Sequence, residues 1–138
     1  MTGMGRESAS QARVVLADDD VDWRELLAAS LARAGHHVEQ VADGRELQLL
    51  LEAAEVTGRS PDLVVSDHLM PYATGLEVLA WAARHTPEVP FVILSAFAAP
   101  FVRRPALRLG ALAVIDKPVD VDVLEARIAE ILGRRLHN

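Results

Sequence analysis

The sequence predicts an α/β fold with a five-stranded parallel sheet, doubly wound in a (βα)5 order so that helices cover both faces. Two observations predict it. Short apolar runs recur without the polar alternation of a half-exposed strand, which is typical of strands buried on both faces. A stretch with helical periodicity follows each run. Strict alternation of strand and helix implies right-handed crossovers between parallel strands.

Four apolar runs place strands at residues 14–17, 63–65, 91–94 and 112–115. A weaker strand is expected at 38–41. Each is four residues or fewer and rich in Val, Leu or Ile. Strands this short fit the interior of a small α/β domain.

Start and stop signals place the helices between these strands. In the first helix, Asp22 with Glu25 three residues later resembles a capping box, and Gly35 can close the helix in the left-handed conformation. The second, third and last helices are expected to begin near Gly44, at Thr74 with Glu77, and at Asp120. The fourth helix, within residues 98–109, contains Pro100 and Pro105. Pro105 does not fit a first turn, so we expect this helix to be short, kinked or mobile.

Length and composition favour one domain. With 138 residues, we expect a folded domain at 13–133, a disordered N-terminal tail at 1–12 and a C-terminal tail at 134–138. The net charge of −6 argues against direct nucleic-acid binding. No apolar run approaches membrane-spanning length, and the chain has no cysteine. We therefore expect a cytoplasmic protein that does not contact a membrane.

Polar residues follow four of the predicted strands. They are residues 18–20, three aspartates in a row, then Asp67, Ser95 and Lys117. The carboxyl ends of parallel strands meet at one edge of a sheet, so these side chains should converge. Carboxylates from two strand ends repel one another, and a hard divalent cation such as Mg²⁺ resolves the repulsion. Asp67 would then be a nucleophile toward phosphorus, with Ser95 and Lys117 as donors to the transferred group.

Five segments carry a resemblance to a known family. They are VVLADDD at 14–20, VVSDHLMPYATG at 64–75, ILSA at 93–96, GA at 110–111 and KP at 117–118. In order and spacing they resemble the receiver domains of bacterial two-component systems, over roughly residues 13–132. The likeness is to the stand-alone, chemotaxis-regulator type. It implies the flavodoxin-like strand order 2-1-3-4-5.

The resemblance also implies roles for single residues. Asp18, Asp19 and Asp67 would bind Mg²⁺, and Asp67 would accept a phosphoryl group from a histidine kinase or a histidine phosphotransfer protein. Ser95 and Lys117 would contact that group. The domain would not be an enzyme beyond its own phosphorylation and dephosphorylation. It would signal to a downstream effector protein, as a monomer or a phosphorylation-dependent dimer.

Several positions depart from the family pattern or lie beside it. Val114 occupies a position that is usually aromatic, which puts the usual ring rotation in doubt. Leu69 and Phe97 are apolar where polar residues are frequent, so we expect slow loss of phosphate. Arg24 is a common feature of the first helix, and we interpret it as structural.

Two other functions remain open. One is a receiver-like adaptor that works without phosphorylation, with the acidic pocket as a remnant. The other is a metal-dependent phosphohydrolase that uses Asp67 in turnover. Such an enzyme needs a general acid near its nucleophile, and the residues two positions either side, Val65 and Leu69, are apolar. The sequence therefore argues against the phosphohydrolase.

Overall fold

A computed structural model describes residues 11–96 and 100–136. Its elements, in chain order, are β1 (Arg13–Ala17), α2 (Val21–Arg33), β2 (His37–Val41), α3 (Gly44–Thr57), β3 (Leu63–Asp67), α4 (Gly75–His85), β4 (Phe91–Ala96), α5 (Pro100–Arg108), β5 (Ala113–Lys117) and α6 (Val121–Leu136). The strands form one parallel sheet in the order β2-β1-β3-β4-β5. The predicted fold class and strand order are confirmed.

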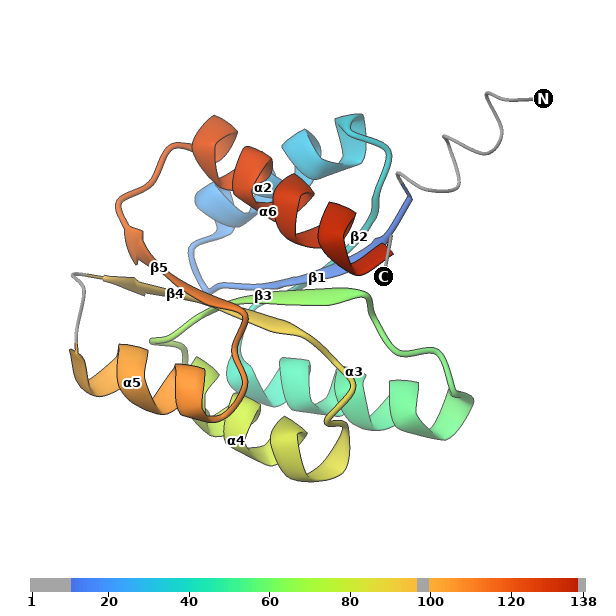
Figure 1. Ribbon diagram of the computed structural model, residues 1–138, viewed down its shortest axis with the longest axis vertical. Helices are drawn as coiled ribbons and strands as arrows, with labels where there is room; N and C mark the ends of the chain where they lie inside the picture. Colours follow the sequence, from blue (N-terminus) through green and yellow to red (C-terminus); the bar gives the residue numbers. More distant parts are fainter. Residues whose placement is uncertain (1–10, 97–99, 137–138) are drawn as a thin grey trace.

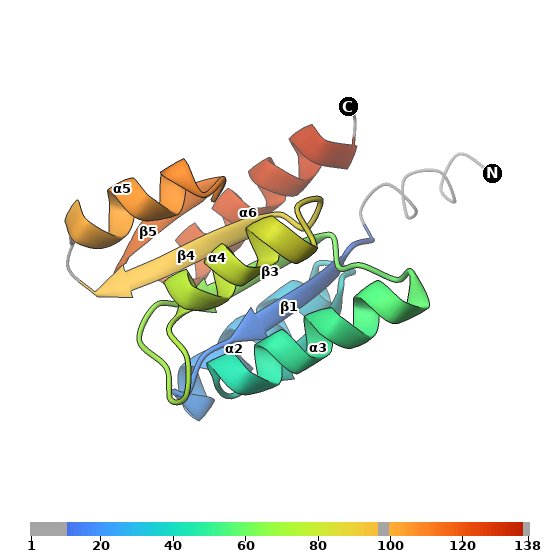
Figure 2. The ribbon, with the colours of Figure 1, turned by 90° about the horizontal axis from the view of Figure 1, so that it is seen from below.

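The sheet separates two helical layers. Helices α2 and α6 cover one face, and α3, α4 and α5 lie side by side on the other (Figures 1 and 2). Successive residues of the central strands pack into the hydrophobic cores on opposite faces of the sheet. In β3, Val64 packs toward the α3–α5 layer, whereas Leu63 and Val65 pack toward α2 and α6. Covering both faces accounts for the unbroken hydrophobic runs of the inner strands.

The structure corrects one predicted helix start. The side chain of Asp20, not Asp22, caps α2 by accepting a hydrogen bond from the backbone N–H of Trp23 at 3.2 Å. The Asp22–Glu25 capping box is wrong because α2 begins at Val21, which places Asp22 in its first turn. The capping box of α4 between Thr74 and Glu77 is confirmed in both directions.

Helix α5 forms in spite of its internal proline. It has nine residues and contains Pro105, and Val102 and Ala106 are buried on its inner side. The helix is therefore short, as expected. Tertiary burial of one face offsets the hydrogen bond that proline cannot donate.

The ends of the folded region differ from the predicted boundaries. Ala12 is buried, and its carbonyl accepts a hydrogen bond from the backbone N–H of His37 at 2.8 Å. Helix α6 continues to Leu136, past the expected boundary at residue 133. Residues 1–10 of the expected N-terminal tail lie outside the described residues. No helix in the described ranges is both long enough and apolar enough to cross a membrane.

The start of α4 is packed directly on the end of β3. A Cβ added to Gly75 would meet the backbone oxygen of Asp67 at a distance that Cβ atoms essentially never show, with the Ser66 hydroxyl at 3.0 Å. Gly133, in α6, has open space around its Cα. The two glycines therefore differ in what an added methyl group meets.

We expect Gly75→Ala to lower the free energy of unfolding by about 2 kcal/mol because the added methyl group overpacks a backbone contact. Gly133→Ala should raise it by about 0.5–1 kcal/mol through helix propensity. Urea unfolding followed by circular dichroism measures both values. Equal effects of the two substitutions would contradict the close packing at Gly75.

Candidate functional site

Three carboxylates meet at the carboxyl ends of β1 and β3. Asp18 and Asp19 follow β1, and Asp67 ends β3. One carboxylate oxygen from each lies within 4.8 Å of the others, so the three residues could hold a metal ion. Asp18 is buried, Asp67 is half-buried and Asp19 is exposed. The donor set is all oxygen, as hard divalent cations prefer.

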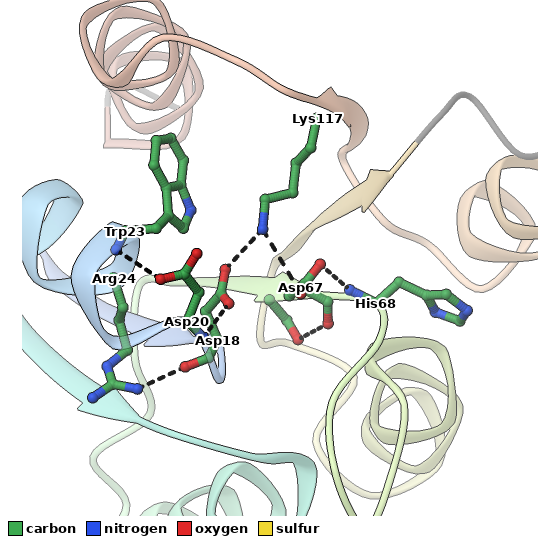
Figure 3. A network of polar contacts seen from close by, with 8 residues as sticks. Asp18, Asp20, Trp23, Arg24, Asp67, His68 and Lys117 are labelled. Atoms are coloured by element: carbon green, nitrogen blue, oxygen red, sulfur yellow. Dashed lines mark hydrogen bonds and ion pairs between the residues drawn. The ribbon is translucent and has the colours of Figure 1, made fainter.

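The loop that carries Asp18 and Asp19 is fixed by hydrogen bonds around Asp18. Its Oδ1 accepts a hydrogen bond from the backbone N–H of Asp20 at 2.9 Å. Its backbone oxygen accepts one from Nη1 of Arg24 at 2.6 Å, and Nε of Arg24 donates to Oε1 of Gln40 at 3.0 Å. Figure 3 shows the contact between Arg24 and Asp18. Together with the bond to Gln40, it ties the acidic loop both to α2 and to β2. These contacts agree with the interpretation of Arg24 as structural.

Lys117 lies between the two strand ends. Its Nζ is 3.1 Å from Oδ2 of Asp18 and 3.8 Å from Oδ2 of Asp67 (Figure 3). Only 22% of the lysine side chain is exposed, so these contacts are shielded from water more than a surface ion pair is. The lysine at the end of β5 therefore joins the aspartates of β1 and β3, as the sequence predicted.

Asp67 has a perturbed acidity. Burial, followed by repulsion from Asp18 and Asp19, raises its pKa from 3.8 to about 6. The attraction of Lys117 and a hydrogen bond from the backbone N–H of His68 to Oδ1 at 2.9 Å act in the opposite direction. Three carboxylates and one lysine gather here, and burial of Asp67 is the main cost of ionising it. The site favours either a proton or a further cation.

Ser95 is brought to the same edge by strand register. Asp67 pairs with Leu94 across β3 and β4, and Ser95 is the next residue of β4. Ser95 is buried. Among the described residues, its hydroxyl makes no hydrogen bond with the acidic cluster. Only the pairing of β3 with β4 places Ser95 near the three carboxylates.

The positions that depart from the family pattern differ in burial. Leu69, two residues after Asp67, is 66% exposed, whereas Phe97 lies outside the described residues. Val114 is buried, and its backbone oxygen accepts a hydrogen bond from Nη1 of Arg103 at 3.1 Å. Arg103 also pairs with Asp116 at 3.1 Å, which connects α5 to β5.

The parallel order 2-1-3-4-5 and the acidic cluster at the strand ends together define a receiver module. The chain belongs to the response regulator receiver domain family, which it matches over residues 14–129.

Relatives and solved structures agree with this assignment. The chain is 36% identical over 126 residues to the transcriptional regulatory protein TcrA of Mycobacterium tuberculosis, an alignment that covers 91% of this chain and 47% of the relative. It is 31% identical over 127 residues to the response regulator protein PilR of Pseudomonas aeruginosa, covering 91% and 27%. The Francisella response regulator 1452 receiver domain is 27% identical with a TM-score of 0.77, covering 90% and 98%. The chain spans about a quarter to a half of the length of these curated relatives.

The raised pKa of Asp67 makes stability depend on pH. A carboxyl group whose folded pKa exceeds its unfolded value stabilises the fold while it is protonated, below about pH 4, and this contribution is lost as pH rises toward 6. An asparagine side chain is neutral at every pH. In the absence of metal, we therefore expect Asp67→Asn to raise the free energy of unfolding by about 1–2 kcal/mol at pH 7. This expected gain is smaller than for a fully buried carboxyl group because Asp67 is partly exposed.

The gain should vanish near pH 4, and urea unfolding across this range measures it. Asp22→Asn is a suitable control because Asp22 is exposed in the first turn of α2. A gain from Asp67→Asn that is independent of pH would contradict the raised pKa.

Arg24→Ala should weaken the binding of a divalent cation by about tenfold, because the loop bearing Asp18 and Asp19 loses its tie to β2. Titration with Mg²⁺, followed by the fluorescence of Trp23 in a Trp81→Phe background, measures the affinity. Arg24→Lys should restore it only in part, since lysine cannot donate to Asp18 and Gln40 in the same fork. Unchanged affinity in Arg24→Ala would show that the loop holds its shape without the arginine.

Proposed function

We propose that this chain is a phosphorylation switch in which Asp67 accepts a phosphoryl group from a phosphohistidine. The donor is a sensor histidine kinase or a histidine phosphotransfer protein. The observation that carries the proposal is the position of Lys117, with its ammonium within 4 Å of carboxylates from two strands. A core-packing role gives no reason to gather these charges at one edge.

The residues support an in-line transfer. A carboxylate oxygen of Asp67 attacks phosphorus, the phosphorus–nitrogen bond of the donor breaks, and the electron pair goes to the imidazole nitrogen. Lys117 lies where it can neutralise charge on the transferred oxygens. Ser95, at the end of β4, is the candidate hydroxyl donor. Asp18, Asp19 and Asp67 would hold Mg²⁺, which when bound would offset the negative charge of the phosphoryl group.

The output is a change in protein contacts. We assign the domain a downstream effector protein, with no direct nucleic-acid or membrane contact, a cytoplasmic location, and a monomeric or phosphorylation-dependent dimeric state. Apart from its own phosphorylation and dephosphorylation, we assign it no catalytic activity. The exposed apolar side chain of Leu69 supports slow loss of phosphate, since it offers no polar group to orient an attacking water.

A phosphate-independent adaptor is the second candidate, and Val114 is the observation that favours it. Its side chain is buried and aliphatic, and it has no polar tip that could report the state of the site by rotating outward. In this alternative, partner binding would persist in Asp67→Ala and without Mg²⁺.

The test is the intact mass of the protein after incubation with phosphoramidate and Mg²⁺. We expect the wild type and the control Asp22→Asn to gain one phosphoryl group. Asp67→Asn should gain none, and Lys117→Ala should gain it at least about tenfold more slowly because the phosphoryl charge loses its counter-ion. Omitting Mg²⁺ should abolish the gain. No gain in the wild type under any of these conditions would favour the adaptor.

A further inference from the structure

The face of α3 that points to solvent is apolar, whereas a surface helix normally presents polar side chains there. Leu49, Ala53 and Val56 are all exposed, and their spacing of i, i+4 and i+7 puts them on one side of the helix. Leu49 is 54% exposed and Val56 is 87% exposed. Exposed apolar residues are common singly, but these three follow one another along two turns. They contribute little to the core, and we call them the α3 ridge.

A groove runs along one side of the α3 ridge, with a volume of about 600 Å³. One wall is apolar and belongs to α3, and the other is polar and belongs to β1 and β2; they are lined by Leu50, Ala53 and Ala54, and by Arg13, His37 and Glu39. Ala53 belongs to both the ridge and the groove, so the two form one continuous surface. The groove is open because α3 is the outermost helix of its layer, with α4 on one flank and the edge strand β2 under the other (Figure 2).

The polar side of this surface carries unbalanced positive charge, although the chain as a whole has a net charge of −6. The carboxylate of Glu39 is already paired, with Oε1 2.8 Å from Nη2 of Arg13. Arg59 also lines the groove, and within residues 11–96 and 100–136 neither Arg59 nor Arg45 makes an ion pair. Arg45 lies in the first turn of α3, where the helix dipole disfavours a cation. Exposed arginines therefore stand beyond both ends of the α3 ridge.

The acidic side chains of α3 are engaged elsewhere or lie off this surface. Oε1 of Glu46 accepts a hydrogen bond from the backbone N–H of Ala42 at 2.7 Å, and Oε2 of Glu52 accepts one from the Gln48 amide at 3.4 Å. Glu55 is rotated by about 100° around the helix axis from its neighbour on the ridge. The surface therefore favours an occupant that is apolar in its middle and acidic at its ends.

We propose that the α3 ridge and its groove bind an amphipathic helix of a partner protein, with apolar residues at i, i+4 and i+7 and an acidic residue beyond each end. The ridge spans about 10 Å of helix axis, which matches two turns of a second helix. Ala53 at its centre is small, so the two helices can approach closely. The groove lies at the amino ends of β1 and β2, and the acidic cluster lies at the carboxyl ends of β1 and β3. The inference therefore does not rest on the phosphoryl-accepting function.

The test uses a phage-displayed library built on one stable helical peptide scaffold with its outward positions randomised. The library is selected on the immobilised full chain, while soluble protein carrying both Leu49→Glu and Val56→Glu removes peptides that bind elsewhere. We expect the enriched peptides to combine apolar residues at i, i+4 and i+7 with acidic residues at both ends. Their affinity is then measured by fluorescence anisotropy. Val56→Ala should weaken it about tenfold, because the ridge loses an apolar anchor.

Charge exchange and matched variants make the result specific. Arg59→Glu should weaken the binding of an enriched peptide about tenfold, and a lysine in place of the facing acid of the peptide should restore most of it. Val123→Ala, on α6 and also exposed, makes the same truncation on the other face of the sheet and should leave the affinity unchanged. Because Val56 is exposed, Val56→Ala should not move the midpoint of urea unfolding, which separates lost binding from lost structure.

Three results would overturn the helix site. One is a selection that does not enrich the apolar pattern with acidic ends. Another is an affinity that stays the same in both Leu49→Ala and Val56→Ala. The third is a dimer that analytical ultracentrifugation detects in the wild type and not in Val56→Ala, which would assign the ridge to a second copy of this chain. Weaker binding in Val56→Ala and Arg59→Glu, with Val123→Ala unaffected and the wild type monomeric, supports a partner helix.

Discussion

The repulsion between carboxylates at the ends of β1 and β3 is the constraint around which this end of the molecule is organised. Asp18 is buried and Asp67 half-buried, and one ammonium, from Lys117, lies between them. Burying such groups together is unfavourable unless charge is supplied from outside. Burial is the main cause of the raised pKa of Asp67, repulsion from Asp18 and Asp19 adds to it, and Lys117 opposes it. A domain selected only for stability would have no reason to keep this arrangement. Its energetic cost is the structural argument for a site that acts on a charged group.

The residues around the acidic cluster hold its backbone in place and supply no reacting group. Arg24 holds the backbone of Asp18, and Gly75 lets α4 start against the backbone of Asp67. The carboxylates are thus fixed through their backbones, and their side-chain oxygens meet backbone N–H groups and the ammonium of Lys117. This division suits a site that must exchange a proton, a metal ion and a phosphoryl group without rebuilding its loops.

The sequence predicted the parts of the site that depend on topology. Asp18, Asp67 and Lys117 follow buried strands, and parallel strands bring their carboxyl ends to one edge, so their meeting could be derived from apolar runs alone. The same logic placed Ser95 at this edge. Strand register does not determine which groups its hydroxyl contacts.

The features that the sequence could not predict depend on contacts with backbone atoms or on angles between elements. The acceptor for Arg24 is a carbonyl oxygen, which every residue possesses and no motif marks. The position of Trp23 beside Lys117 depends on the direction in which α2 leaves the sheet. The start of α2 was misjudged because three consecutive aspartates and Asp22 can all cap a helix, and only the observed geometry selects Asp20.

The polar contacts between α5 and β5 depend on one side chain. Its side-chain polar contacts, within the described residues, come from the guanidinium of Arg103, whose partners are the carbonyl of Val114 and the carboxylate of Asp116. The arginine and Asp116 side chains are 39% and 44% exposed, so each contact is worth about 1 kcal/mol or less. Arg103 therefore connects α5 to β5 only weakly. A protein that offered Arg103 a better carboxylate would break this polar link between α5 and β5 at little energetic cost, while the burial of Val102 and Ala106 would still hold the helix on the sheet.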